Sequence, residues 1–160
     1  DPDAEETEET FSGNALIKAR AVAAMHKNCW VMADDSGLEV EALGSEPGIR
    51  SARYAGKDGD TAANNALLLK NMAGVANRKA RFVCAMALIS PAGEEYLFEG
   101  VCEGGIVETP VGEEGFGYDP LFVPDGFDKT FASLPLDVKN VISHRAKALN
   151  KVKEFLSKVF

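Results

Sequence analysis

Two adjacent carboxylates, Asp34 and Asp35, are the first residues of the chain whose types suggest chemistry. They follow a short apolar run, residues 29–33, that is typical of a buried strand. Carboxylates held in place at the end of a strand can bind a metal ion. Successive strand residues point to opposite sides, so a bend at Gly37 is needed before both can face one ligand. The same pattern is also typical of an Asx turn, in which an aspartate only satisfies backbone amides.

Three basic residues accompany this pair. Lys18 lies four residues after Asn14 on a predicted helix, so the two share a face and Lys18 can meet an anion, although a helical lysine is more often a solvated group. His144 and Arg145 open the last predicted helix, where free backbone amides favour an anion or an acceptor. Each of these two is also typical of a helix-end residue or a surface charge.

A glycine-rich segment, GFGYDP (residues 115–120), places Phe116 and Tyr118 on a permissive backbone. Two aromatic rings in such a loop suit the stacking of a flat base such as a purine. The alternative is that the rings fill the core. Arg50 and Arg53 are equally open to two interpretations, a phosphate contact or surface ion pairs.

The elements that must position these residues follow from periodicity and from capping residues. The acidic pair ends the first strand, and alternation at Leu38, Val40 and Ala42 indicates a second, half-exposed strand. A hairpin is expected with its turn at residues 91–93. The predicted helices run over residues 11–26 after Thr10 or Ser12, from Asp58 or Asp60 to about Met72, and from Ser143 to the end. The result is an α/β fold with a mixed, strongly twisted sheet.

Composition restricts the class of protein. A chain of 160 residues without an evident linker predicts one domain over residues 1–160. The net charge of −8 argues against binding a nucleic acid polymer. No stretch is typical of a transmembrane helix or a signal peptide, so no membrane association is expected. The three cysteines, which lack metal-type spacing, predict mostly buried free thiols and a cytoplasmic location.

Five segments, taken together, resemble the inosine triphosphate pyrophosphatase family, also called Ham1-like. They are TFSGNALIKARA (10–21), ADDSGLEVEAL (33–43), PGIRSARYAG (47–56), GFGYDPLFVP (115–124) and KNVISHRAKAL (139–149). The resemblance implies an ITPase-like fold of two lobes around a long mixed sheet with flanking helices, a nucleotide bound between the lobes, and a homodimer. It also implies Mg²⁺-dependent hydrolysis of ITP, dITP and XTP to the monophosphate and pyrophosphate.

Matching the motifs residue by residue gives expected roles. Asp35 would be the general base and a metal ligand, with Asp34 and Asp3 as further metal ligands. The expected substrate-binding residues are Lys18, Ser36, Phe116, Gly117, Tyr118, Asp119, Lys139, His144 and Arg145. These residue types suit the reaction, because a carboxylate can deprotonate a water that attacks the α-phosphorus, and Mg²⁺ neutralises the triphosphate.

The chain departs from the family in one respect. The resemblance starts just before the first acidic motif, so we expect a chain that is truncated at its N-terminus and lacks the usual phosphate-binding strand and turn. This leaves open a nucleotide-binding or dimerisation module of the same fold with weakened or no catalysis. A related Mg²⁺-dependent pyrophosphatase that prefers pyrimidine or modified bases is a further alternative.

Overall fold

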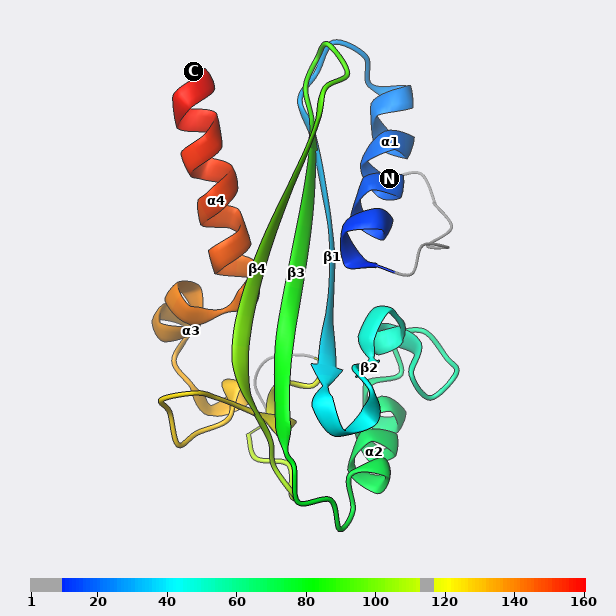
Figure 1. The fold of residues 1–160 in the computed structure, drawn as a ribbon, viewed down its shortest axis with the longest axis vertical. Coiled ribbons are helices and arrows are strands. Elements are labelled where there is room, and N and C mark those ends of the chain that lie inside the picture. Colours follow the sequence, from blue (N-terminus) through cyan, green and yellow to red (C-terminus); the bar gives the residue numbers. More distant parts are fainter. Residues whose placement is uncertain (1–9, 113–116) are drawn as a thin grey trace. The chain divides into compact units, whose positions relative to one another are not determined.

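The computed structural model describes residues 10–112 and 117–160, in which four α-helices and five strands are found (Figure 1). The helices are α1 (Phe11–Met25), α2 (Thr61–Asn71), α3 (Leu136–Ile142) and α4 (His144–Val159). The strands are β1 (Val31–Val40), β2 (Glu46–Pro47), β3 (Lys79–Ile89), β4 (Glu95–Ile106) and β5 (Phe122–Pro124). Short 3₁₀ helices at Glu41–Leu43, Gly48–Arg53, Asp119–Leu121 and Phe131–Ser133 complete the elements. An α/β fold with flanking helices is confirmed.

Capping residues set the starts of two helices as expected. The Thr10 hydroxyl accepts a hydrogen bond from the Gly13 amide (3.0 Å) at the start of α1. At the start of α2, the Asp60 carboxylate accepts one from the Ala63 amide (3.2 Å). Each bond satisfies an amide that the helix itself leaves without a partner.

The five described strands form one sheet in the order β2-β1-β3-β4-β5. The β3–β4 hairpin turns at residues 91–93, as predicted, with the Ser90 amide bonded to the Glu94 carbonyl (2.9 Å). Strands β1 and β2 pair antiparallel, and so do β4 and β5. These pairs are antiparallel where we expected a mixed sheet. The short connection between β1 and β2, residues 41–45, is sufficient for an antiparallel pair but not for a parallel crossover.

Strand β1 runs without interruption through the acidic pair, from Val31 to Val40. We expected one strand to end at Asp34 and Asp35 and another to begin near Leu38, and this is wrong. Gly37 lies inside the strand and makes no bend there. The extended backbone is retained because each carboxylate has a cationic partner on a helix, so neither needs a turn to satisfy it.

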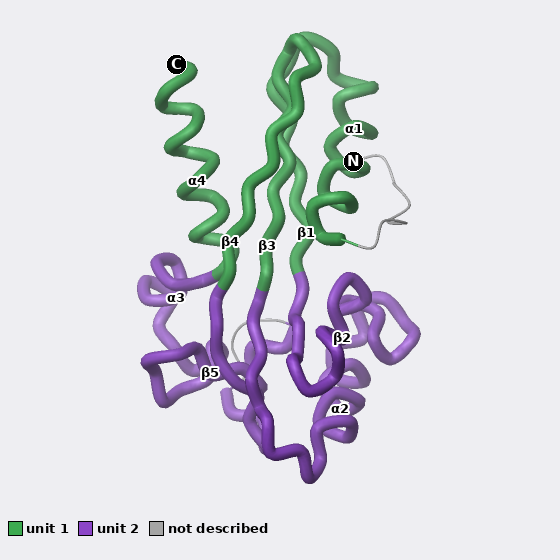
Figure 2. The backbone as a smooth tube through the Cα atoms, viewed as in Figure 1, with its two compact units in different colours: residues 1–36, 83–101, 144–160 green, residues 37–82, 102–143 purple. Residues whose placement is uncertain are grey.

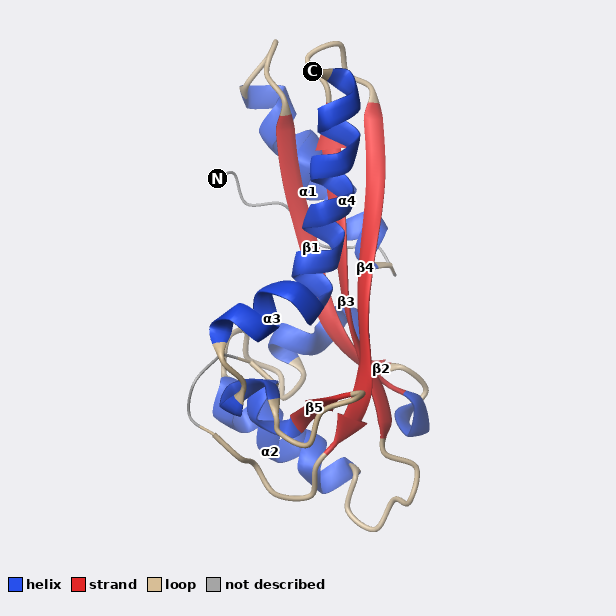
Figure 3. Ribbon diagram, turned by 90° about the vertical axis from the view of Figure 1, so that its left-hand side faces the viewer, coloured by secondary structure: helices blue, strands red, loops and turns tan. Residues whose placement is uncertain are grey.

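The chain divides into two compact units (Figure 2). Unit 1 consists of residues 1–36, 83–101 and 144–160. Within it, α1 and α4 cover opposite faces of the strands (Figures 1 and 3). Because both faces are covered, every residue of β3 from Val83 to Ile89 is buried. Its apolar cluster joins Cys84, Met86 and Leu88 of β3 to Ala148 and Val152 of α4.

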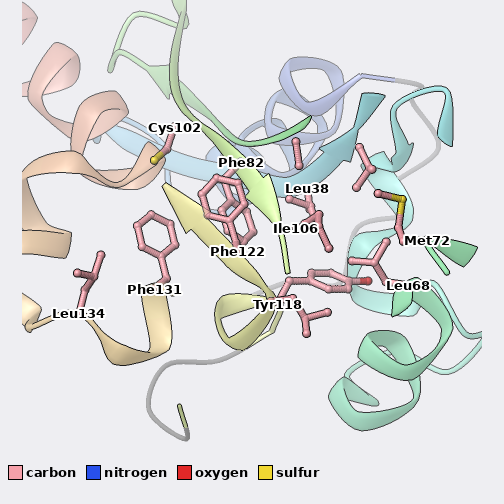
Figure 4. Packing of buried hydrophobic residues seen from close by; sticks show 13 residues of the cluster. Leu38, Leu68, Met72, Phe82, Cys102, Ile106, Tyr118, Phe122, Phe131 and Leu134 are labelled. Carbon is pink, nitrogen blue, oxygen red and sulfur yellow. The ribbon is translucent and has the colours of Figure 1, made fainter. Parts of the chain in front are cut away.

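Unit 2 consists of residues 37–82 and 102–143. Three of its aromatic rings, Phe82, Phe122 and Phe131, pack together, with the Phe82 and Phe122 ring centroids 4.6 Å apart (Figure 4). Leu38, Leu68 and Tyr118 belong to the same buried cluster. The unit is therefore built around its own core.

The three cysteines test a further expectation. Cys84 and Cys102 are buried free thiols as predicted, whereas Cys29 is exposed because it lies in the connection before β1 rather than inside that strand. Among the helices of the described residues, none has the length and apolar character needed to span a membrane.

Candidate active site

Asp35 faces α1 from the middle of β1 and is largely shielded from solvent, at 8% exposure. The Lys18 ammonium on α1 donates to Asp35 Oδ1 (3.3 Å) and to the backbone carbonyl of Asp34 (3.1 Å). Asn14, one turn earlier on the same helix face, is fully buried. A carboxylate that a cation holds in place beside a strand is oriented in advance for binding or proton transfer.

Asp34 points to the other face of β1. Its Oδ2 accepts a hydrogen bond from Arg145 Nη2 (3.2 Å) at the start of α4. This ion pair is well exposed, with 42% of the Asp34 side chain and 53% of the Arg145 side chain accessible. The alternation expected of adjacent strand residues therefore separates the two carboxylates, and the Asx turn is not formed.

His144 precedes Arg145 in the first turn of α4. Burial lowers the pKa of its imidazole to about 4, and the neighbouring Arg145 charge acts in the same direction. The ring is therefore neutral near pH 7, with one nitrogen that donates and one that accepts. A neutral imidazole can recognise a donor and an acceptor on a ligand without adding charge.

Cys84 of β3 lies close to Asp34 and Arg145, and the sequence analysis did not single it out as a site residue. Burial raises the pKa of its thiol, while the nearby Ser36 hydroxyl and the Arg145 charge oppose the rise. Ser36 is thereby placed near the Asp34–Arg145 pair, as part of unit 1. No periodicity in the sequence could reveal this neighbour, because β3 is apolar throughout this stretch.

The glycine-rich segment belongs to unit 2, and Phe116 lies outside the described residues. The Tyr118 ring is 6% exposed and packs in the core, which corresponds to the core-filling alternative (Figure 4). Its hydroxyl donates to the Ser51 carbonyl (2.6 Å), and burial raises the pKa of this phenol. Gly117 has a positive φ of 62°, a conformation that suits glycine.

Asn65 of α2 is a further residue that the sequence analysis missed. Its side-chain amide donates to the Gly117 carbonyl (3.1 Å) and so fixes the backbone of the glycine-rich segment. Nothing in the local sequence indicates the contact between Asn65 and Gly117, because the two residues lie 52 positions apart.

Two further predicted site residues also belong to unit 2. Asp119 begins the 3₁₀ helix that follows Tyr118. Lys139 lies on α3, a helix that we did not predict, and is partly buried.

The expected metal ligands are not brought together in the described part of the chain. Asp3 lies outside it, and Asp34 faces away from Asp35. Residues 10–112 and 117–160 contain no group of three His, Cys, Asp or Glu side chains able to hold a metal ion. Of the three expected ligands, Asp35 is the one placed beside Lys18.

Known proteins resemble this chain over nearly its whole length. The model of the Ham1 family matches residues 1–155. A dITP/XTP pyrophosphatase of an Exiguobacterium species is 52% identical, over 94% of this chain and 78% of the relative, and that of Bacillus subtilis is 50% identical over 95% and 77%. The structure of the Staphylococcus aureus Ham1 protein, 45% identical, matches with a TM-score of 0.94 over 100% of this chain and 83% of its own. A HAM1 protein from Coxiella burnetii, 41% identical, gives 0.90 over 98% and 81%.

Proposed function

Because the chain belongs to the Ham1 family, we propose that it is a pyrophosphatase that hydrolyses ITP, dITP and XTP to the monophosphate and pyrophosphate. The observation that carries this proposal is Asp35, a shielded carboxylate held by Lys18 in a chain about half identical to dITP/XTP pyrophosphatases. The net reaction consumes one water, which ends on the α-phosphorus while the bond from that phosphorus to the bridging oxygen breaks.

Asp35 is the proposed general base. Its carboxylate accepts a proton from the attacking water, and the electron pair of the broken bond leaves on pyrophosphate. Lys18 fixes the orientation of that carboxylate through the 3.3 Å contact, and its ammonium is also proposed to contact a phosphate oxygen. Ser36, the next residue along β1, is proposed to bind substrate as well.

Mg²⁺ is the cofactor that we propose. The ion is commonly held by one or two carboxylates, with phosphate oxygens and waters completing its shell, so Asp35 alone is an adequate protein ligand. The geometry of β1 fits this smaller set better than a pair of adjacent aspartates, because Asp34 faces the opposite side. When bound, Mg²⁺ neutralises triphosphate charge and polarises its oxygens.

Base recognition is assigned to Lys139, His144, Arg145 and residues 116–119. Arginine only donates, so Arg145 can bond a 6-keto oxygen, whereas a 6-amino purine would set donors against donors. Tyr118 is buried, so we propose that it supports the loop backbone through its bond to Ser51 rather than stacking on the base. Phe116 remains the proposed stacking ring. A homodimer and a cytoplasmic location also remain predictions.

The test is pyrophosphate release from ITP, dITP, XTP, dATP and dCTP by this chain, with Mg²⁺ and with a chelator. We expect release that requires the metal and is selective for the 6-keto substrates ITP, dITP and XTP. Asp128→Asn, at an exposed residue of unit 2, is a control for the loss of one carboxylate and should behave like the parent chain. Binding of ITP without release would instead support a non-catalytic module, and preferential release from dCTP would support a pyrimidine enzyme.

A further inference from the structure

The first turns of α4 lie directly on β4, and a glycine makes this possible. A Cβ atom added to Gly100 would overlap the His144 carbonyl oxygen and the Ala148 amide nitrogen, and would come within 3.0 Å of Lys147 Cβ. Two of these three atoms belong to the helix backbone, which cannot move aside as a flexible side chain can. Gly100 therefore determines how closely the turn that carries His144 and Arg145 approaches the strand.

Two lysines of α4 bond the strand on either side of this glycine. Lys147 donates to the Val101 carbonyl (3.1 Å), and Lys151 donates to the Glu99 carbonyl (2.6 Å). These carbonyls flank Gly100 along β4. The close approach of the helix backbone is thus reinforced by bonds along the strand.

A third contact fixes the opposite side of the turn. Sheet order places β3 between β4 and β1, and Arg145 reaches Asp34 on β1 through the 3.2 Å bond. The Cys84 thiol of β3 interacts with both Asp34 and Arg145, which places the pair across this middle strand. The first turn of α4 is therefore held at β4 by Gly100 and at β1 by Asp34.

We propose that Gly100 and Asp34 are positioning residues that aim His144 and Arg145 at the substrate base, and that Asp34 does not bind the metal. The inference rests on the proposed function. A guanidinium that rotates freely offers its donors in many directions, whereas one bonded to Asp34 presents its remaining N–H groups in a fixed fork. Displacements near 1 Å can cost about 10²-fold in rate, so the position of the first turn of α4 affects the discrimination between bases.

The first experiment compares two glycines of β4. Gly100→Ala must displace α4, whereas a Cβ at Gly105 would lie at an ordinary 3.4 Å from the Arg78 carbonyl. We expect Gly100→Ala to raise KM for dITP and to lower the dITP-to-dATP ratio of kcat/KM about tenfold or more. Gly105→Ala should leave both unchanged, apart from small effects of a strand glycine on stability. Equal effects of the two substitutions would overturn the role of Gly100.

The second experiment uses Asp34→Asn, which retains the side-chain size and does not depend on whether Gly100→Ala folds. Loss of the ion pair should lower the dITP-to-dATP ratio about two- to fivefold, as for an exposed pair, and mainly through KM. The Mg²⁺ concentration that gives half-maximal rate should not change. A raised Mg²⁺ requirement with unchanged selectivity would overturn the proposal and make Asp34 a metal ligand.

Arg145→Gln and the double variant complete the test. If Asp34 acts through Arg145, adding Asp34→Asn to Arg145→Gln should produce no further loss of selectivity. Additive losses would overturn the positioning role. The parent chain separates the two proposals: no pyrophosphate release by the parent contradicts the proposed function, whereas an active parent with unaltered Asp34→Asn selectivity contradicts only this inference.

Discussion

The two faces of β1 in unit 1 carry the same residue type in unlike surroundings. Asp35, with 9% of its side chain exposed, contacts Lys18 of α1, while Asp34, with 42% exposed, contacts Arg145 of α4. An unbroken strand separates two carboxylates that are neighbours in sequence. An acidic pair is thus not necessarily one site, and here its members are suited to different tasks, proton transfer on one face and positioning on the other.

The largest expected effect comes from removing the charge of Asp35. Asp35→Asn retains the shape of the side chain but cannot accept the proton of the attacking water, so kcat for dITP should fall about 10²- to 10⁴-fold. Steady-state pyrophosphate release measures this, with circular dichroism as the check on folding. If Asp34→Asn lost as much activity as Asp35→Asn, the difference between the two faces would not exist.

On the face of β1 that contacts α4, His144 should make the stability of the chain sensitive to acid. The pKa of His144 is lowered to about 4 in the folded chain, below its usual 6.5, so between these values the unfolded chain binds more protons. The free energy of unfolding should therefore decrease as pH falls from 6.5 towards 4, by up to about 3 kcal/mol. Urea unfolding at several pH values measures the slope.

His144→Gln provides the matched comparison for this slope, because it replaces the imidazole by a side chain that does not titrate. The variant should lose the part of the pH dependence that lies between pH 6.5 and 4. If its unfolding free energy fell with pH as steeply as that of the parent chain, carboxylates elsewhere would account for the acid sensitivity, and burial of His144 would not distinguish the α4 face.

Lys18 tests the other face. Lys18→Met retains much of the apolar stem but removes the donor to Asp35 and to the Asp34 carbonyl. Because Lys18 is partly exposed, we expect only about 1–2 kcal/mol of lost stability. The rate should fall about tenfold or more, since the base is no longer oriented. Urea unfolding and kcat for dITP measure the two effects, and an unchanged kcat would exclude Lys18 as the residue that orients Asp35.

Local signals in the sequence predicted much of the fold. Thr10 and Asp60 cap helices, and the turn at residues 91–93 forms its hairpin, because these features depend on neighbours in the chain. The site could be predicted only as a set of residue types. That β1 continues past Asp35 depends on partners from two helices, of which Arg145 on α4 lies 111 residues from Asp34 in the sequence. The Tyr118 hydroxyl likewise finds its acceptor at Ser51, 67 residues away. Tertiary partners therefore decided what local patterns left open.

The smallest expected effect separates the two ion pairs by their response to salt. Double-mutant cycles for Asp34 with Arg145 and for Asp35 with Lys18 give two coupling free energies of unfolding, each measured in urea so that the denaturant adds no charge. The exposed Asp34–Arg145 pair should contribute about 0.2–1 kcal/mol at low ionic strength. At 1 M salt, where the screening length is about 3 Å, this coupling should nearly vanish. The Lys18–Asp35 coupling should persist in part, because Asp35 is shielded from the ions. Equal loss of both couplings would mean that solvent reaches the two faces alike, and the shielding of Asp35 would then no longer explain why this carboxylate, rather than its neighbour, acts as the base.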